Sequence, residues 1–218
     1  PGDPSQPEIW PKVLQEIEYC YERPDGKVTY PAAITIDLGG GFTHEVAMFC
    51  RDKIERRVWP IRGMASTGRA IPIWPKKPGR TDRIQVPFYN VGVNQAKNVV
   101  FGRLLNDRPG PAYYHFNLDP NAGFDADFFE QLTAEKRVLK YKGTQRYYVW
   151  ENKQRKRNEA WDLTVYNYAA LCGLMSEGMI LNEVIENDFF MLDSEYEPPE
   201  PDKPKPDISS SSTKRNSK

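Results

Sequence analysis

The stretch that decides the fold is AAITIDLGGGFTHEVAMFC, which covers Ala32–Cys50. Its apolar residues lead to a single carboxylate, Asp37, after which come three glycines and, from Thr43, a helical apolar pattern. This order predicts a buried strand, a sharp turn and a helix. An aspartate at the carboxyl end of a strand lies where open α/β sheets bind their ligands. Asp37 is therefore a candidate active-site residue, and capping of the turn is the alternative interpretation.

The flanking segments continue the alternation of strand and helix. The predicted helices cover 9–20, 43–53, 94–104, 125–135 and 158–178, with Asn94 and Asp125 as caps, and the predicted strands cover 33–37, 58–61, 85–93, 112–116 and 145–150. Such alternation is typical of an α/β domain around a largely parallel sheet. Residues 63–83 have no period and are predicted to be a long loop, with cations that either follow a phosphate backbone or are solvated. We expect one domain over residues 1–192 and a disordered tail over 193–218.

The composition excludes several classes of protein. The chain has 30 Lys plus Arg and 30 Asp plus Glu among 218 residues, so its net charge favours no polyanionic partner. Its three cysteines are far apart and have no zinc-ligand spacing, which is typical of free thiols in a reducing compartment. No apolar run approaches the length of a membrane span, and no signal peptide precedes the domain. The expected location is cytoplasmic.

Basic residues concentrate before the last predicted helix. Nine cations interleave with aromatic residues in the 22 residues from 136 to 157: Lys136, Arg137, Lys140, Lys142, Arg146, Lys153, Arg155, Lys156 and Arg157. A basic surface with exposed aromatics is typical of a nucleic-acid contact, and a solvated charged face is the alternative.

Two further carboxylates, Glu159 and Asp162, lie three residues apart at the start of that helix and so project from one side of it. Favourable interaction with the helix dipole would explain them without a function. If they converge with Asp37, they could instead hold divalent metal ions for attack of water on a phosphodiester, because Mg²⁺ prefers oxygen ligands.

Other kinds of site find little support. The chain has no P-loop motif. The glycine turn after Asp37 is similar to a phosphate-binding turn of actin-like ATPases, but that family needs two such turns and this chain has one. His44 and His115 stand alone, and His115 is expected to be a hydrogen-bonded core residue. No arrangement of Ser, His and Asp or of Cys and His is present.

Taken together, the segments of this chain resemble the C-terminal nuclease region of the lambda-like (GpA-type) terminase large subunit, the DNA-packaging motor of tailed bacteriophages. The resemblance covers about residues 1–175 and is carried, in the family's order, by PGDPSQPEIW, AAITIDLGGGFTHEVAMFCRDK, VWPIRGM, FYNVGVNQAKNVVFGRL, GPAYYHFN, FFEQLTAEKRV and RNEAWDLTVYNYAAL.

The resemblance implies a ribonuclease H-like fold with a mostly parallel sheet flanked by helices. It also implies an endonuclease, dependent on Mg²⁺ or Mn²⁺, that cuts concatemeric double-stranded DNA at packaging sites. Asp37 and Asp162 match metal ligands, and Glu159 matches a ligand or a base that orients water. Asn94 departs from the pattern, because an acid is common at its position.

The same resemblance implies partners and a location. The partners are double-stranded DNA, the terminase ATPase domain, the small subunit and, through the C-terminal tail, the portal protein; the location is the cytoplasm of the infected host. The residues expected to contact DNA are Lys97, Lys153, Arg155, Lys156 and Arg157, with a helix-surface position as the alternative for Lys97.

One departure concerns the start of the chain. In the family, the first catalytic aspartate lies on a strand upstream of the segment that resembles PGDPSQPEIW, so the sheet is expected to lack its N-terminal strand or strands. Two alternatives to a complete nuclease therefore stay open. The chain could be a catalytically incomplete DNA-binding or portal-docking module of the same motor, or a fragment of an actin-like ATPase.

Overall fold

The computed structural model of the chain describes residues 2–23, 25–66, 69–80 and 85–182. The predicted tail over 193–218, the last ten residues of the predicted domain and Arg83 of the predicted basic loop lie outside the described residues.

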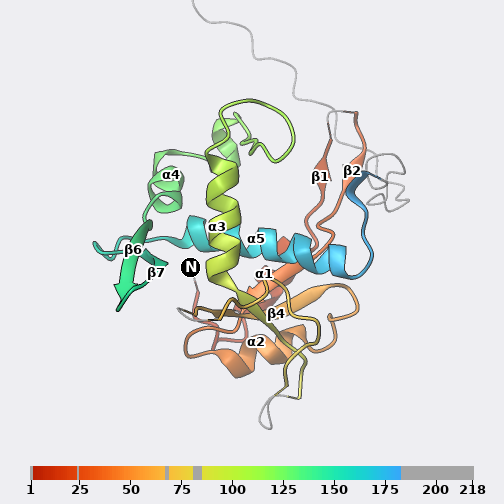
Figure 1. Ribbon diagram of the computed structural model, residues 1–218. Coiled ribbons are helices and arrows are strands. Elements are labelled where there is room, and N and C mark those ends of the chain that lie inside the picture. The colour runs from red at the N-terminus through yellow and green to blue at the C-terminus, as the bar shows by residue number, and fades with distance from the viewer. Residues whose placement is uncertain (1, 24, 67–68, 81–84, 183–218) are drawn as a thin grey trace, which may run out of the picture.

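Helices and strands alternate through most of the chain, as predicted (Figure 1). The helices are α1 (Ile9–Ile17), α2 (Thr43–Cys50), α3 (Val93–Leu104), α4 (Ala126–Leu132) and α5 (Glu159–Ser176). The strands are β1 (Tyr21–Glu22), β2 (Val28–Thr29), β3 (Ile34–Asp37), β4 (Val58–Met64), β5 (Tyr89–Gly92), β6 (Lys136–Lys142) and β7 (Gln145–Glu151), with a 3-10 turn over Pro120–Ala122. None of the described helices is long and apolar enough to cross a membrane.

The central sheet consists of β3, β4 and β5 in that order, and all of its strands are parallel. The first four residues of the middle strand β4 (58–61) are buried, as expected for a parallel strand that is covered on both faces. Asp37 lies opposite Ile61 in the register. The prediction of a mostly parallel sheet is confirmed.

Helices cover the two faces of this sheet. On one face, Val46, Ala47 and Cys50 of α2 pack in a cluster that includes Val58. On the other face, Ala169 of α5 packs with Ile61. Because alternate residues of a strand face opposite sides, β4 joins the two layers.

Aromatic rings pack tightly where α5 crosses the sheet. Trp59 of β4 lies 4.9 Å from Trp74, and Trp74 stacks on Tyr89 at 4.5 Å, measured between ring centroids. A Cβ atom at Gly173 of α5 would lie 2.8 Å from atoms of both tryptophan rings. Glycine at this position therefore allows α5 to approach the sheet closely.

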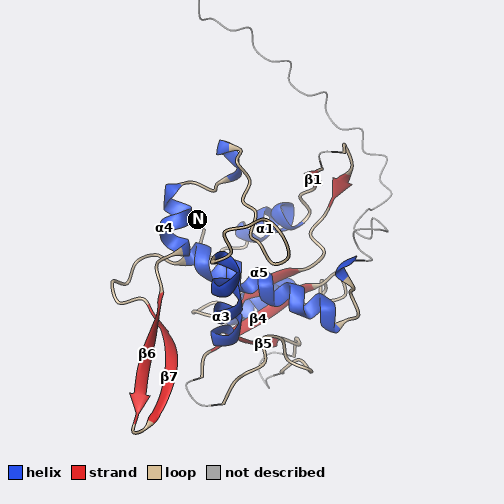
Figure 2. Cartoon of the chain, turned by 45° about the horizontal axis from the view of Figure 1, so that its top comes forward, coloured by secondary structure: helices blue, strands red, loops and turns tan. Residues whose placement is uncertain are grey.

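A second core lies between α3, α4 and α5. Val100 of α3, Leu132 of α4 and Val165 of α5 are buried together there with Trp161. The antiparallel hairpin of β6 and β7 joins this core through Trp150, whose ring lies 5.2 Å from that of Trp161, and from there it extends away from the body of the molecule (Figure 2).

Two local predictions were wrong, and the strand β6 was missed. Residues 112–116 form no strand, because aromatic side chains there, such as Phe116, pack against Phe128 and Phe129 instead of pairing their backbone. Asn94 does not cap α3, which begins one residue earlier at Val93. The exposed strand β6 was not foreseen, since a strand that buries neither face has no alternating apolar pattern.

Candidate active site

Asp37 is held in place by the turn that follows it. The backbone N–H of Gly39 donates a hydrogen bond of 2.8 Å to Oδ1 of Asp37, and Gly40 has a φ of +82°, which favours glycine. Leu38, which directly follows Asp37, is buried, and its backbone N–H donates to the carbonyl oxygen of Ile61. One carboxylate oxygen therefore caps the turn, and the other remains for contacts outside it.

The second oxygen of Asp37 meets Tyr166 of α5. The Tyr166 hydroxyl donates to Oδ2 of Asp37 over 3.2 Å. Burial, and then the negative charges of Asp37 and Asp162, raise the pKa of Tyr166, so its hydroxyl stays protonated and serves as a donor. Gly63 makes room for it, because a Cβ atom there would lie 2.7 Å from the hydroxyl oxygen.

Asp162 lies one helical turn before Tyr166 on α5. Its Oδ1 is 3.3 Å from the ammonium of Lys97, and its Oδ2 accepts a hydrogen bond of 3.2 Å from the side-chain amide of Asn158. Burial raises the pKa of Asp162, the Lys97 charge lowers it, and the charges of Glu135 and Glu159 raise it further. The carboxylate therefore ionises less readily than an ordinary aspartate.

The residues that hold Asp162 are themselves fixed by a buried carboxylate. The ammonium of Lys97 is 2.8 Å from both oxygens of Glu135, and Asn158 donates to one of them over 2.9 Å. The side chains of Lys97 and Glu135 are only 11% and 9% exposed. The alternative interpretation of Lys97 as a helix-surface lysine is therefore wrong, and its ammonium pairs with Glu135 and Asp162. The DNA contact of Lys97 stays a prediction.

The predicted carboxylates are thus brought together in part. The Tyr166 hydroxyl contacts Asp37, and Asp162 lies one turn before Tyr166 on the same helix, where it contacts Lys97 and Asn158. Glu159 is exposed at the first position of α5 and belongs to no ion pair among the described residues. Asn94 donates its amide to the backbone oxygen of Ser66, which ties α3 to the loop that follows β4.

Sequence reasoning missed three residues of this site: Tyr166, Glu135 and Asn158. Tyr166 follows Asp162 by four residues, the spacing that places two side chains on one side of a helix, so its position could have been inferred. Asn158 directly precedes Glu159 in the stretch RNEAWDLTVYNYAAL, which carries part of the family resemblance. Glu135 carries no such signal, because its partner Lys97 lies 38 residues away.

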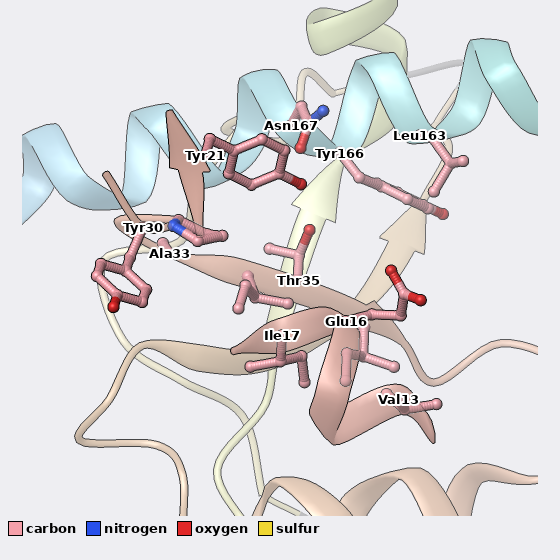
Figure 3. A pocket seen from close by; sticks show the side chains of 13 residues that line it. Val13, Glu16, Ile17, Tyr21, Tyr30, Ala33, Thr35, Leu163, Tyr166 and Asn167 are labelled. Carbon is pink, nitrogen blue, oxygen red and sulfur yellow. The ribbon is translucent and has the colours of Figure 1, made fainter. Parts of the chain in front are cut away.

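An apolar cavity of about 480 Å³ borders this site on the outer edge of β3. Figure 3 shows Tyr166, Leu163 and Asn167 of α5 facing β3, with Glu16 and Ile17 of α1 on the other side. Within the described residues, no strand pairs with the outer edge of β3. Tyr166 therefore lines this cavity and also contacts Asp37.

The donors fit a hard divalent cation. Within the described residues, no group of three or more His, Cys, Asp or Glu side chains is placed to hold a metal ion. Magnesium is commonly bound through one or two carboxylates, with water and substrate phosphates as its other ligands. Asp37 and Asp162 can supply that smaller set.

The predicted DNA-contacting cations before α5 differ in their surroundings. Lys156 pairs with Glu130, and Lys153 lies 3.7 Å from Glu151. Arg155 and Arg157 are exposed, and neither pairs with an acid in the described part of the chain.

Comparison with known proteins identifies relatives of this chain. The family model of the terminase large subunit gpA, endonuclease domain, matches residues 1–179. The terminase large subunit of Escherichia phage lambda is 31% identical over 166 residues, which are 73% of this chain and 25% of that protein. That of Enterobacteria phage P21 is 31% identical over 176 residues, or 78% of this chain and 26% of that protein. The chain thus spans about a quarter of the length of these relatives. No solved structure matches.

Proposed function

This chain belongs to the endonuclease-domain family of the gpA terminase large subunit, and on that premise we propose that it cuts concatemeric double-stranded DNA at phage packaging sites in a reaction that depends on Mg²⁺ or Mn²⁺. The proposal includes a ribonuclease H-like fold and the cytoplasm of the infected host as the place of action. The family match spans the glycine turn, so it replaces the actin-like interpretation of that turn.

The observation that carries the proposal is the hydrogen bond from Tyr166 to Asp37, which links the strand end that carries Asp37 to the helix that carries Asp162 one turn before Tyr166. The two aspartates are 125 positions apart in the sequence and come from a strand end and a helix. Each has one oxygen fixed by a local amide donor, from Gly39 and Asn158 respectively. Carboxylates that are held in place in this way are suited to binding a cation. A purely structural role would not require this orientation.

In the proposed site, Asp37 and Asp162 hold the metal ion. The ion, when bound, would activate water and stabilise the leaving oxygen of the phosphodiester. Tyr166 keeps Oδ2 of Asp37 oriented by donating a hydrogen bond to it, and Lys97, itself held by the buried Glu135, keeps Asp162 oriented. Glu159, exposed at the start of α5, is free to orient water or to complete the ligand set.

The test compares cleavage and metal binding in matched variants. We expect the chain to nick supercoiled plasmid DNA with Mn²⁺ and to lose this activity with a chelator. Asp37→Asn and Asp162→Asn should each lower the rate by about 100-fold or more and weaken Mn²⁺ binding measured by calorimetry. Asp107→Asn, at an exposed position, is the control. Undiminished cutting by Asp37→Asn would contradict the assigned role.

A second candidate is a DNA-binding or portal-docking module of the same motor without a working active site. It is favoured by Asn94, whose amide is engaged by the backbone of Ser66 where the family commonly has an acid. It predicts DNA binding that weakens steeply with salt and does not respond to chelators. The ATPase domain, the small subunit and the portal protein are the proposed partners in either case, and the tail proposed to dock on the portal lies outside the described residues.

A further inference from the structure

The hairpin of β6 and β7 has two faces of different character. Residues directly opposite each other in an antiparallel pair share a face, and the faces alternate along the strands. The register places Arg137 opposite Trp150, Leu139 opposite Tyr148 and Tyr141 opposite Arg146 on one face. We call this set of six residues the Tyr141 face.

The base of the Tyr141 face is anchored to the body of the protein. The Trp150 ring packs on Trp161 and meets Phe101 edge-on at 5.4 Å, and its indole N–H donates to the side chain of Asn98 over 3.2 Å. Arg137 lies over the rings of Phe101 and Tyr148, at 5.4 and 4.7 Å. The hairpin is therefore held in a fixed direction relative to α3.

Beyond this anchor, the Tyr141 face is open. Tyr141 is 68% exposed, Tyr148 is 54% exposed and Leu139 is 37% exposed. The hairpin that carries these side chains extends from the body of the molecule (Figure 2). Exposure of aromatic and aliphatic side chains to water is unfavourable, and an exposed surface of this kind is typical of a binding site.

The charges on the hairpin indicate what kind of partner fits. The Tyr141 face carries two arginines, Arg137 and Arg146, and no acidic residue. The acid of the hairpin, Glu151, lies on the other face, where it pairs with Lys140. Lys136, Lys140 and Lys142 also lie on that other face, so both faces of the hairpin carry a positive net charge, and a polyanion is attracted to the arginines beside the exposed rings.

The exposed aromatic rings also indicate which form of nucleic acid can bind, paired or unpaired. Exposed tyrosines can stack on bases only when the bases are unpaired, since the faces of bases in a duplex are covered by their neighbours. Tyr141 and Tyr148 are diagonal neighbours on the same face, roughly 7–8 Å apart at the backbone. Successive bases of a single strand could therefore stack on them.

We propose that the Tyr141 face binds a stretch of unpaired DNA, with bases stacked on Tyr141 and Tyr148 and phosphates near Arg146. The inference rests on the proposed function for the choice of DNA as the nucleic acid. It concerns residues that the proposed cleavage site does not use.

The experiment measures binding of the full chain to fluorescent oligonucleotides by anisotropy, with a chelator present so that cleavage plays no part. The probes are a 20-nucleotide thymidine strand and a duplex of equal length. Tyr141→Leu should weaken binding of the single strand about tenfold and leave duplex binding within about twofold. Tyr141→Phe keeps the ring and should bind like the unmodified chain.

Tyr147 provides a matched control, because it is a tyrosine on the opposite face of the same hairpin. Tyr147→Leu should change neither affinity. Equal effects of the two leucine variants, equal losses for duplex and single strand, or no binding of the single strand would each overturn the proposal. Self-association of the chain that Tyr141→Leu abolishes would assign the face to a protein contact and overturn it as well. Because no metal is present, these results do not depend on whether the chain cuts DNA.

Discussion

The two aspartates of the candidate site are supported in different ways. Asp37 is oriented mainly by its own turn, through the backbone N–H of a residue two positions away. Asp162 depends on Lys97, which in turn depends on Glu135. The strand side of the site is thus built from local geometry, and the helix side from side chains distant in sequence.

This difference determines where the site is vulnerable. A side-chain substitution does not remove the backbone donor of Gly39, although a Cβ atom there would lie 3.0 Å from Oδ2 of Asp37. The helix side contains buried charges, which are costly when one member of a pair is lost. Mutations should therefore destabilise the helix side more than the strand side.

The largest effect is expected for Lys97→Met, which leaves Glu135 buried without its partner. The free energy of unfolding should fall by about 3 kcal/mol, since breaking a buried ion pair from one side is strongly destabilising. In the double variant Lys97→Met/Glu135→Met no uncompensated charge of the pair remains, and part of the loss should be recovered. Urea denaturation measures both changes.

Lys12→Met is the control for this comparison, because Lys12 is exposed on α1. It should change stability by less than about 0.5 kcal/mol. If Lys97→Met proved as harmless as Lys12→Met, the helix side would not depend on the buried pair.

A smaller effect is expected at Gly63 of β4, where the strand side of the site contacts Tyr166 of the helix side. Gly63→Ala places a Cβ atom 2.7 Å from the Tyr166 hydroxyl and 3.0 Å from Val93. It should cost about 1–3 kcal/mol through overpacking. In a Tyr166→Phe background the closest contact is absent, so the same substitution should cost less. Thermal unfolding of the four proteins tests this coupling, and strictly additive costs would show that Gly63 and Tyr166 act independently.

The smallest effect concerns pH. Because the pKa of Asp162 is raised above its ordinary value of 3.8, this group favours the folded state at low pH, and that contribution is lost as the pH rises through the raised pKa. Asp162→Asn cannot ionise, so it should be more stable than the unmodified chain at neutral pH. The difference should shrink as the pH falls below 3.8.

Urea midpoints at pH 7 and pH 3.5 measure this trend, with Asp107→Asn as a control. Lower stability of Asp162→Asn at neutral pH would mean that the ion pair with Lys97 outweighs the cost of burial.

Local features of the fold could be predicted from the sequence. The strand, turn and helix around Asp37 follow from an apolar run and three glycines, and Asp125 caps α4 as predicted, by accepting from the backbone N–H of Phe128. These features depend on residues within a few positions of one another.

Features that depend on distant contacts could not be predicted. Lys97 follows Asn94 in a polar helical turn, and only the position of Glu135 on another segment makes it buried. Residues 112–116 are rich in aromatic residues, as strands are, but their side chains are used in the packing around α4. In both cases tertiary packing overrides the local pattern.

The placement of the tryptophans gives this protein two separate optical reporters. Trp59 and Trp74 pack together under α5 at the central sheet, whereas Trp150 and Trp161 pack together where the hairpin joins the second core. Replacing one pair by phenylalanine would leave an emission signal dominated by the other region, apart from Trp10 on α1. Stopped-flow fluorescence of the two variants could then show whether the sheet and the hairpin form at the same rate during folding, and ligand titrations could show which region responds to DNA.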